Sequence, residues 1–258
     1  MKIYVINLPQ SRERRENILR ECARFDLEPE MVPGVDGGSL TREQIRNLVF
    51  EPEANPLGPS EIGCTLSHLE IYRRMREGNI PFALVLEDDS VFSLDPRPLL
   101  AGFARKSANR PEVYLLTRRN NIHIGAKRPE NIGGMSFYRG WNGFGGNGYV
   151  VTGEGAKNIL RFQTPLKVMC DDWKQFALHG AIQFFVCERE IVGLRKELAQ
   201  ASLLARDRIN NDGRARRRFF RRVRKMAPLP LRAKYLFRKL WHWRNLRRQP
   251  NWEWAADA

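Results

Sequence analysis

The sequence contains few cysteines and histidines, and none of them stand in a zinc-finger spacing. Its four cysteines, Cys22, Cys64, Cys170 and Cys187, are far apart in a chain of 258 residues. This pattern argues against a zinc finger and against a disulfide-dense secreted scaffold. Each cysteine falls in a segment with helix or strand character, so we interpret all four as buried free thiols of a reducing compartment.

Long apolar stretches are also missing. No uninterrupted apolar run reaches the roughly 18 residues that a membrane-spanning helix needs. The chain starts directly with a strand-like segment, residues 3–8, which is too short for a signal peptide. We therefore expect a cytoplasmic protein that meets the inner face of the membrane only at its surface.

Acidic residues are absent from a long stretch near the C-terminus. Residues 213–250 contain fifteen of the 44 Lys and Arg residues and no Asp or Glu, so the other 29 bases are balanced by all 29 acids. The body is thus formally neutral although the whole chain carries +15. We predict two units, a globular domain over residues 1–200 and a basic tail over residues 201–258.

The basic tail also contains aromatic residues among its bases. A Pro-Leu-Pro breaker at residues 228–230 divides it, which predicts two short basic amphipathic helices. Such helices bind anionic bilayer surfaces, where each base adds ~1 kcal/mol and the rings reach the headgroup level. We expect residues 213–248 to bind an anionic membrane, with nucleic acid as the weaker alternative.

The body has the alternating pattern of an α/β domain. Apolar runs and turn residues predict strands over residues 3–8, 82–86, 113–116, 135–138, 149–152 and 182–187. Helices are predicted to follow Ser11 and to cover residues 60–77, 154–162 and 171–179. The glycine-rich residues 140–148 are expected to form a loop.

Three acids follow the most apolar of these strands. Residues 82–86 read as a buried central strand, and Glu87, Asp88 and Asp89 come directly after it. Strand ends of this kind are ligand-binding positions in open α/β sheets. A divalent cation such as Mg²⁺ or Mn²⁺ would relieve the repulsion between the acids and would suit a diphosphate leaving group. The alternatives are solvent-facing acids, or a metal-dependent phosphatase or nuclease.

A second possible metal site is weaker. Cys64 and His68 are four residues apart, a helical spacing that can place both side chains on one ion. We do not predict a metal site there, because the sequence shows no third soft ligand.

Five motifs in a fixed order make the chain resemble glycosyltransferase family 25, the lipooligosaccharide galactosyltransferase group. They are Val-Ile-Asn-Leu at 5–8 with Ser11 and Arg-Arg at 14–15, Val-Asp-Gly at 35–37, Glu-Ile-Gly-Cys-Thr-Leu-Ser-His at 61–68, Leu-Val-Leu-Glu-Asp-Asp at 84–89, and Gly-Tyr-Val-Val at 148–151 with Gly-Ala-Lys at 155–157. Each motif alone is weak, and the order makes the resemblance fairly specific.

The resemblance implies a type A glycosyltransferase fold, a Rossmann-like mixed sheet flanked by helices. It implies transfer of galactose or glucose from a UDP-sugar to a lipooligosaccharide-like, lipid-linked glycan, with inversion. The acids at 87–89 would replace the metal-binding Asp-x-Asp motif, with Asp89 as the primary ligand of Mn²⁺ or Mg²⁺ and Glu87 beside it. The rival functions are a metal-dependent phosphoesterase and a nucleic-acid-binding protein without enzymatic activity.

The resemblance also implies a donor pocket. Its expected residues are Asn7, Leu8, Arg12, Arg15, Asp36, Gly37, His68, Glu87, Asp88, Asn147 and Gly148. Trp141 is a further possible sugar contact.

An inverting transfer needs a carboxylate that takes the proton of the acceptor hydroxyl. Asp171 and Asp172 are the candidates, at a predicted helix start whose dipole favours ionised acids. The neighbouring Trp173 suggests a sugar-binding face. The alternative is that both acids only cap the helix.

Overall fold

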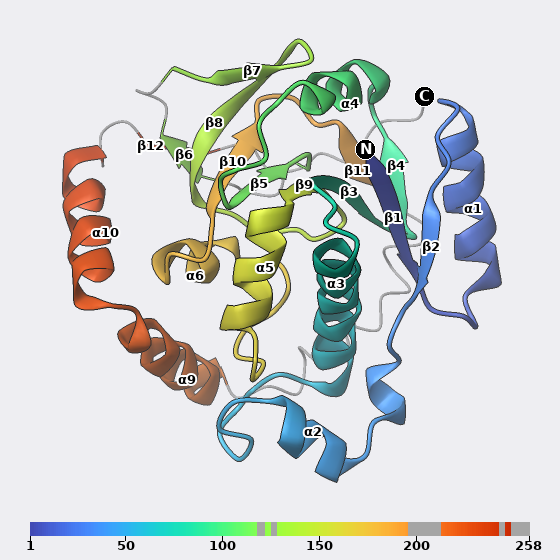
Figure 1. The fold of residues 1–258 in the computed structure, drawn as a ribbon. Coiled ribbons are helices and arrows are strands. Elements are labelled where there is room, and N and C mark those ends of the chain that lie inside the picture. Colours follow the sequence, from blue (N-terminus) through green and yellow to red (C-terminus); the bar gives the residue numbers. More distant parts are fainter. Residues whose placement is uncertain (118–121, 125–127, 196–212, 243–245, 249–258) are drawn as a thin grey trace.

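The computed structural model describes residues 1–117, 122–124, 128–195, 213–242 and 246–248 (Figure 1). In this part of the chain a mixed sheet has the strand order β12-β6-β8-β10-β5-β9-β3-β1-β2, with β7 paired to β8. Its strands are β1 (Lys2–Asn7), β2 (Glu30–Pro33), β3 (Phe82–Glu87), β5 (Glu112–Leu115), β6 (Ile122–Ile124), β7 (Glu130–Ile132), β8 (Met135–Asn142), β9 (Gly148–Thr152), β10 (Gln183–Cys187) and β12 (Leu246–Arg248). A separate ribbon pairs β4 (Ser90–Phe92) with β11 (Val192–Leu194).

The strands change direction near the middle of the sheet. β1 is parallel to both of its neighbours, β2 and β3, whereas β9 runs antiparallel between β3 and β5. Beyond it, β5 and β10 are parallel to each other. The expected mixed sheet flanked by helices is therefore confirmed, and it agrees with the type A glycosyltransferase fold that the resemblance implies.

Helices cover both faces of the sheet (Figure 1). They are α1 (Arg12–Ala23), α2 (Arg42–Leu48), α3 (Pro59–Glu77), α4 (Arg97–Ala104), α5 (Gly153–Phe162), α6 (Trp173–Leu178), α9 (Gly213–Met226) and α10 (Leu229–His242). Successive strand residues point to opposite faces of the sheet, and each face has its own hydrophobic core. Tyr4 packs in the core with α3, α5 and α6, and Val5 packs in the core with α1 and α4. This alternation is the pattern of a sheet that is buried on both sides.

The basic tail forms the two expected helices, which meet at Ala227 and Pro228. α9 belongs to the core, because Phe219 and Val223 are buried in the cluster of α3 and α5. Arg216 on the same helix makes two hydrogen bonds, of 3.0 and 2.9 Å, to the fully buried Glu61. The predicted domain boundary at residue 200 lies outside the described residues.

The glycine-rich stretch differs from the expected loop. β8 continues through Asn142 and β9 begins at Gly148, so only residues 143–147 form the connection. Gly140 fits in a strand because its missing side chain leaves room for the Phe184 ring, whose nearest atom would be 2.0 Å from an added Cβ. Glycine here marks a close packing contact within the sheet.

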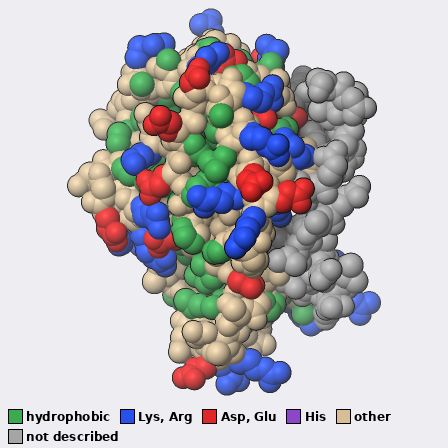
Figure 2. All heavy atoms as spheres, turned by 90° about the vertical axis from the view of Figure 1, so that its right-hand side faces the viewer, with side chains coloured by type: hydrophobic (Ala, Val, Ile, Leu, Met, Phe, Trp, Pro, Cys, Tyr) green, Lys and Arg blue, Asp and Glu red, His purple; other side chains and the backbone are tan. Residues whose placement is uncertain are grey.

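Charges on the body are of mixed sign. On the face that carries α1 and β2, Lys and Arg side chains are interspersed with Asp and Glu (Figure 2). This mixture agrees with the formal neutrality of the body. Among the described helices, none combines the length and the apolar character that crossing a membrane requires.

Candidate active site

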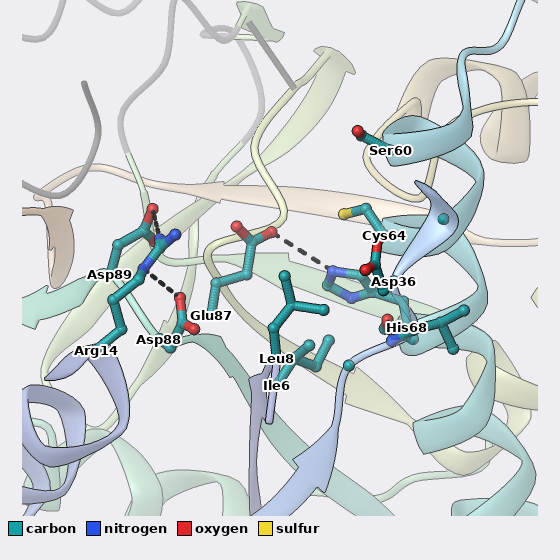
Figure 3. Close-up of a pocket in the computed structure, with 14 residues that line it drawn as sticks. Ile6, Leu8, Arg14, Asp36, Ser60, Cys64, His68, Glu87, Asp88 and Asp89 are labelled. Carbon is teal, nitrogen blue, oxygen red and sulfur yellow. Dashed lines mark hydrogen bonds and ion pairs between the residues drawn. The ribbon is translucent and has the colours of Figure 1, made fainter. Parts of the chain in front are cut away.

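A pocket lies where the carboxyl ends of β1, β2 and β3 meet. The strands are parallel, and their registers pair Ile6 with Glu87 and Asn7 with Pro33, so the residues that follow each strand gather at one edge. The pocket is lined by Ile6, Leu8, Arg14, Gly34, Val35, Asp36, Gly37, Ser60, Cys64, Ser67, His68, Glu87, Asp88 and Asp89 (Figure 3). Residues from four of the sequence motifs therefore line one pocket, at the strand ends where open α/β sheets bind ligands.

Two glycines, Gly37 and Gly63, allow the turn at residues 34–37 to pack closely against α3. A Cβ on Gly37 would lie 1.7 Å from the carbonyl oxygen of Pro59, and one on Gly63 would lie 2.5 Å from the nitrogen of Gly37. The backbone N–H of Val35 donates to Ser67 Oγ at 2.8 Å. These contacts fix the Val-Asp-Gly turn against the helix that carries Cys64 and His68.

The acid cluster is compensated by one arginine. Arg14 on α1 lies 2.8 Å from Asp88 and 2.6 Å from Asp89, and both acids are largely buried. The side-chain amide of Asn7 donates to Asp88 at 2.7 Å. Burial raises the pKa of Asp88, and the charge of Arg14 with the bond from Asn7 offsets part of that rise. An all-oxygen donor set of this kind fits Mg²⁺ or Mn²⁺.

Glu87 points to the opposite side, toward α3 (Figure 3). Its Oε1 lies 3.5 Å from Nε2 of the buried His68, while Nδ1 of that ring is 2.8 Å from the Tyr149 hydroxyl. Burial opposes a charge on His68, but the neighbouring Cys64 and Glu87 outweigh this effect and raise its pKa to about 9. The tyrosine hydroxyl in turn lies 2.6 Å from that of Tyr72.

The loop at residues 143–147 connects the pocket with the predicted catalytic acids. The N–H of Gly145 donates to Asp171 at 3.0 Å, and the indole N–H of Trp173 donates to the Gly145 carbonyl at 3.0 Å. The adjacent Gly146 lies close to Glu87, because a Cβ there would be 3.0 Å from Glu87 Oε1. The short loop therefore bonds to Asp171 and lies against Glu87.

Asp172 begins α6 and its side chain accepts a hydrogen bond of 3.2 Å from the Gln175 N–H. Burial raises the pKa of Asp172 to about 6. Neither Asp171 nor Asp172 is among the residues that line the pocket. Their role as the base stays a prediction.

Trp173 does not have the role that the sequence suggested. It is fully buried and packs edge-on against Tyr149 and beside Phe176, so it offers no face to a sugar. Trp141 lies in a different hollow and stacks on Tyr235 of α10. Both indoles hold elements together within the body.

The remaining predicted donor residues divide into two groups. Asn147 and Gly148 lie at the start of β9, where the Asn147 carbonyl accepts bonds from the Glu87 N–H and the Ser90 hydroxyl. Arg12 and Arg15 are exposed on α1 and do not line the pocket.

Arg14 is a charged pocket residue that the sequence prediction left out. The signal for it was present, because Arg14, Ile18 and Cys22 follow each other at intervals of four residues along α1. Ile18 and Cys22 are buried against the sheet, so this spacing puts Arg14 on the inward face.

Comparisons with known proteins agree with the motif order. The sequence model of glycosyltransferase family 25 (LPS biosynthesis protein) matches residues 1–173. Human procollagen galactosyltransferase 2 is 26% identical over 173 residues, which are 62% of this chain and 27% of that protein. A glycosyltransferase 25 family member of Anopheles gambiae is 34% identical over 185 residues, 65% of this chain and 30% of that protein. The chain thus spans under a third of the length of these relatives.

A solved structure described as a glucose-1-phosphate thymidylyltransferase of Bacillus anthracis, in complex with a sucrose, is 13% identical. The structural match covers 84% of this chain and 99% of the thymidylyltransferase chain, with a TM-score of 0.40.

Proposed function

Because the chain belongs to glycosyltransferase family 25, we propose that it transfers galactose or glucose from a UDP-sugar to a lipooligosaccharide- or lipopolysaccharide-type glycan, with inversion. The observation that carries this proposal is the cluster of Glu87, Asp88 and Asp89 at the end of the central strand β3. The names of relatives support galactose, and the family description supports an LPS-type acceptor.

The acid cluster is the proposed binding place of the diphosphate. Asp89 would hold Mn²⁺ or Mg²⁺, which would neutralise charge on the diphosphate leaving group. Glu87, expected from the sequence as the second ligand, points toward His68, so we propose that it meets the donor from the other side of the pocket. Arg14 pairs with both Asp88 and Asp89 and so orients their carboxylates. Leu8, together with the turn at residues 34–37, forms the wall that would bind the nucleoside.

The proton of the acceptor hydroxyl is the second requirement of the reaction. Asp172, with its pKa raised to about 6, would be ionised at neutral pH and more basic than an exposed aspartate. Asp171 bonds to the loop that reaches Glu87, which would position the acid segment beside the transferred sugar. We propose that one of these two acids is the base.

Release of nucleoside diphosphate from a panel of nucleotide sugars tests this function, with Mn²⁺ or Mg²⁺ and a glycan acceptor. We expect one UDP-hexose to be turned over, and chelation to stop the release. A phosphoesterase would instead cleave simple phosphate esters and leave nucleotide sugars intact, which would contradict the proposal.

We further propose that α10 holds the protein at the cytoplasmic face of an anionic membrane. Leu229, Leu236, Phe237 and Leu240 are 73%, 58%, 63% and 75% exposed, and their spacing places them along one side of the helix. Tyr235 faces the body, where it stacks on Trp141 at 4.4 Å. An apolar stripe among basic residues is typical of helices that lie in a bilayer surface. At the membrane surface the enzyme would meet a lipid-linked acceptor.

A further inference from the structure

Cys64 and His68, which line the pocket, meet Cys170. One ligand atom from each residue lies within 4.8 Å of those of the other two. Cys64 and His68 are on the same side of α3, and Cys170 comes from the segment before α6. The third soft ligand that the sequence did not reveal is supplied by a contact across 106 residues.

The geometry points to a binding site for a soft divalent cation, with zinc as the expected occupant. The two Sγ atoms are 3.6 Å apart. With Zn–S bonds of about 2.3 Å, two thiolates on a tetrahedral ion are roughly 3.8 Å apart. The sulfurs therefore already have nearly the separation that zinc imposes, and they are well beyond the ~2.0 Å of a disulfide bond.

The histidine is oriented as a ligand. Nδ1 of His68 contacts the Tyr149 hydroxyl at 2.8 Å, so Nε2, the nitrogen that faces Glu87, is the one available for coordination. Nε2 is buried and has no hydrogen bond of ordinary length within the described part of the chain. Ligating histidines in proteins are usually held by a partner on the other ring nitrogen, and Tyr149 has that position here.

The fourth position of the site faces the pocket. Glu87 Oε1 is 3.5 Å from Nε2 of His68, close to the roughly 3.4 Å expected between a nitrogen and an oxygen ligand of one tetrahedral zinc ion. Two thiolates, an imidazole and either this carboxylate or water would complete four-coordination. Thiolate and imidazole ligands select zinc, so the site is chemically distinct from the all-oxygen cluster around Asp89.

The backbone supports the arrangement before any ion binds. The N–H of Cys170 donates to Thr65 Oγ1 at 3.2 Å, which fixes the segment before α6 against α3. A bound ion would brace this junction. The segment also carries Asp171 and Asp172, so the site would help to position both acids next to the pocket.

The test is metal content and spectroscopy of the reduced full chain. After loading with zinc and gel filtration, we expect one zinc per chain, and loading with Co²⁺ should give sulfur-to-cobalt charge-transfer absorption. Cys170→Ser should lose the zinc and that absorption. Cys22→Ser is the matched control, because Cys22 is a buried thiol on α1 that lies outside the cluster, and it should retain both. Asp89→Asn should retain both as well.

Absence of bound zinc in the reduced wild type would overturn the inference, as would a cobalt spectrum without sulfur ligation or zinc that persists in Cys170→Ser. A Cys64–Cys170 disulfide in the isolated protein, with no zinc uptake after reduction, would overturn it in favour of a redox pair. The wild-type cobalt spectrum decides the question even if Cys170→Ser does not fold. None of these readouts depends on sugar transfer.

Discussion

The guanidinium of Arg14 lies 2.6 Å from the carboxylate of Asp89, although 75 residues separate them in the chain. Arg14 also pairs with Asp88, so a single side chain from α1 compensates two largely buried acids at the end of β3. The acid cluster can therefore exist without a cation in it. If a cation also binds these acids, it should replace part of the stabilisation that Arg14 provides.

Arg14→Ala should lower the free energy of unfolding by about 2–4 kcal/mol, because it leaves two acids without their compensating charge. Arg15→Ala is the matched control and should change it by less than about 0.5 kcal/mol, since Arg15 is exposed. Urea unfolding gives both values. Mn²⁺ should restore part of the loss in Arg14→Ala; an unchanged midpoint with Mn²⁺ would argue against a cation site at these acids.

Asp172 makes stability depend on pH. Burial raises the pKa of Asp172 to about 6 in the folded protein from its ordinary value of 3.8, so the ionised form destabilises the fold, and stability is gained as pH falls from above 6 toward 4. Asp172→Asn keeps a cap for α6 and removes this titration. Its unfolding free energy relative to wild type should rise by about 2 kcal/mol between pH ~4.5 and pH ~8.

Unfolding of both proteins across that pH range measures the difference. A difference that stays constant with pH would show that Asp172 titrates as an ordinary exposed acid, and it would remove the argument for its raised basicity. The pH dependence of transfer should show an acid limb near the same value if Asp172 is the base.

The bond between Arg216 and Glu61 ties α9 to the body. Glu61 is fully buried, and Arg216→Ala removes its two hydrogen bonds from the guanidinium. We expect a loss of about 2–4 kcal/mol in unfolding free energy. Arg217→Ala, at the exposed neighbouring position, should cost less than about 0.5 kcal/mol. Equal effects of the two variants would mean that α9 is not an integral part of the core.

The apolar stripe of α10 should control membrane binding. Phe237→Ser with Leu240→Ser removes two exposed apolar side chains without touching the Tyr235–Trp141 contact. Sedimentation with anionic phospholipid vesicles should show at least a tenfold loss of binding, because each buried apolar side chain adds roughly 1.5–3 kcal/mol. Vesicles of neutral lipid provide the control. Undiminished binding by the double variant, or tighter binding to RNA than to vesicles, would contradict the membrane proposal.

The sequence predicted the long and strongly patterned elements. β3 and α3 were identified because a continuous apolar run and a capped helical periodicity are local signals. β2, β7 and α4 were missed, since three- and four-residue strands and a proline-flanked helix carry little periodicity of their own. Their conformation depends on the sheet and core to which they are added.

The grouping of the candidate residues in one pocket was predictable only where motifs mark strand ends. The acids at 87–89 and the turn at 35–37 do meet in one pocket. The partner of Cys64 was not predictable, because Cys170 lies 106 residues away and only the packing of the segment before α6 against α3 brings the two together. Trp173 was misjudged for the same reason, since a tryptophan beside two acids gives no sign of whether it faces a pocket or the core.

The most direct test of the account is the release of UDP from the preferred UDP-hexose by wild type, Asp89→Asn and Asp26→Asn. Asp26 is an exposed acid in a left-handed turn conformation that asparagine also adopts, so its variant controls for the loss of one charge. We predict at least a hundredfold loss of transfer in Asp89→Asn and wild-type activity in Asp26→Asn. Undiminished transfer by a folded Asp89→Asn protein would contradict the placement of the donor site at the end of β3.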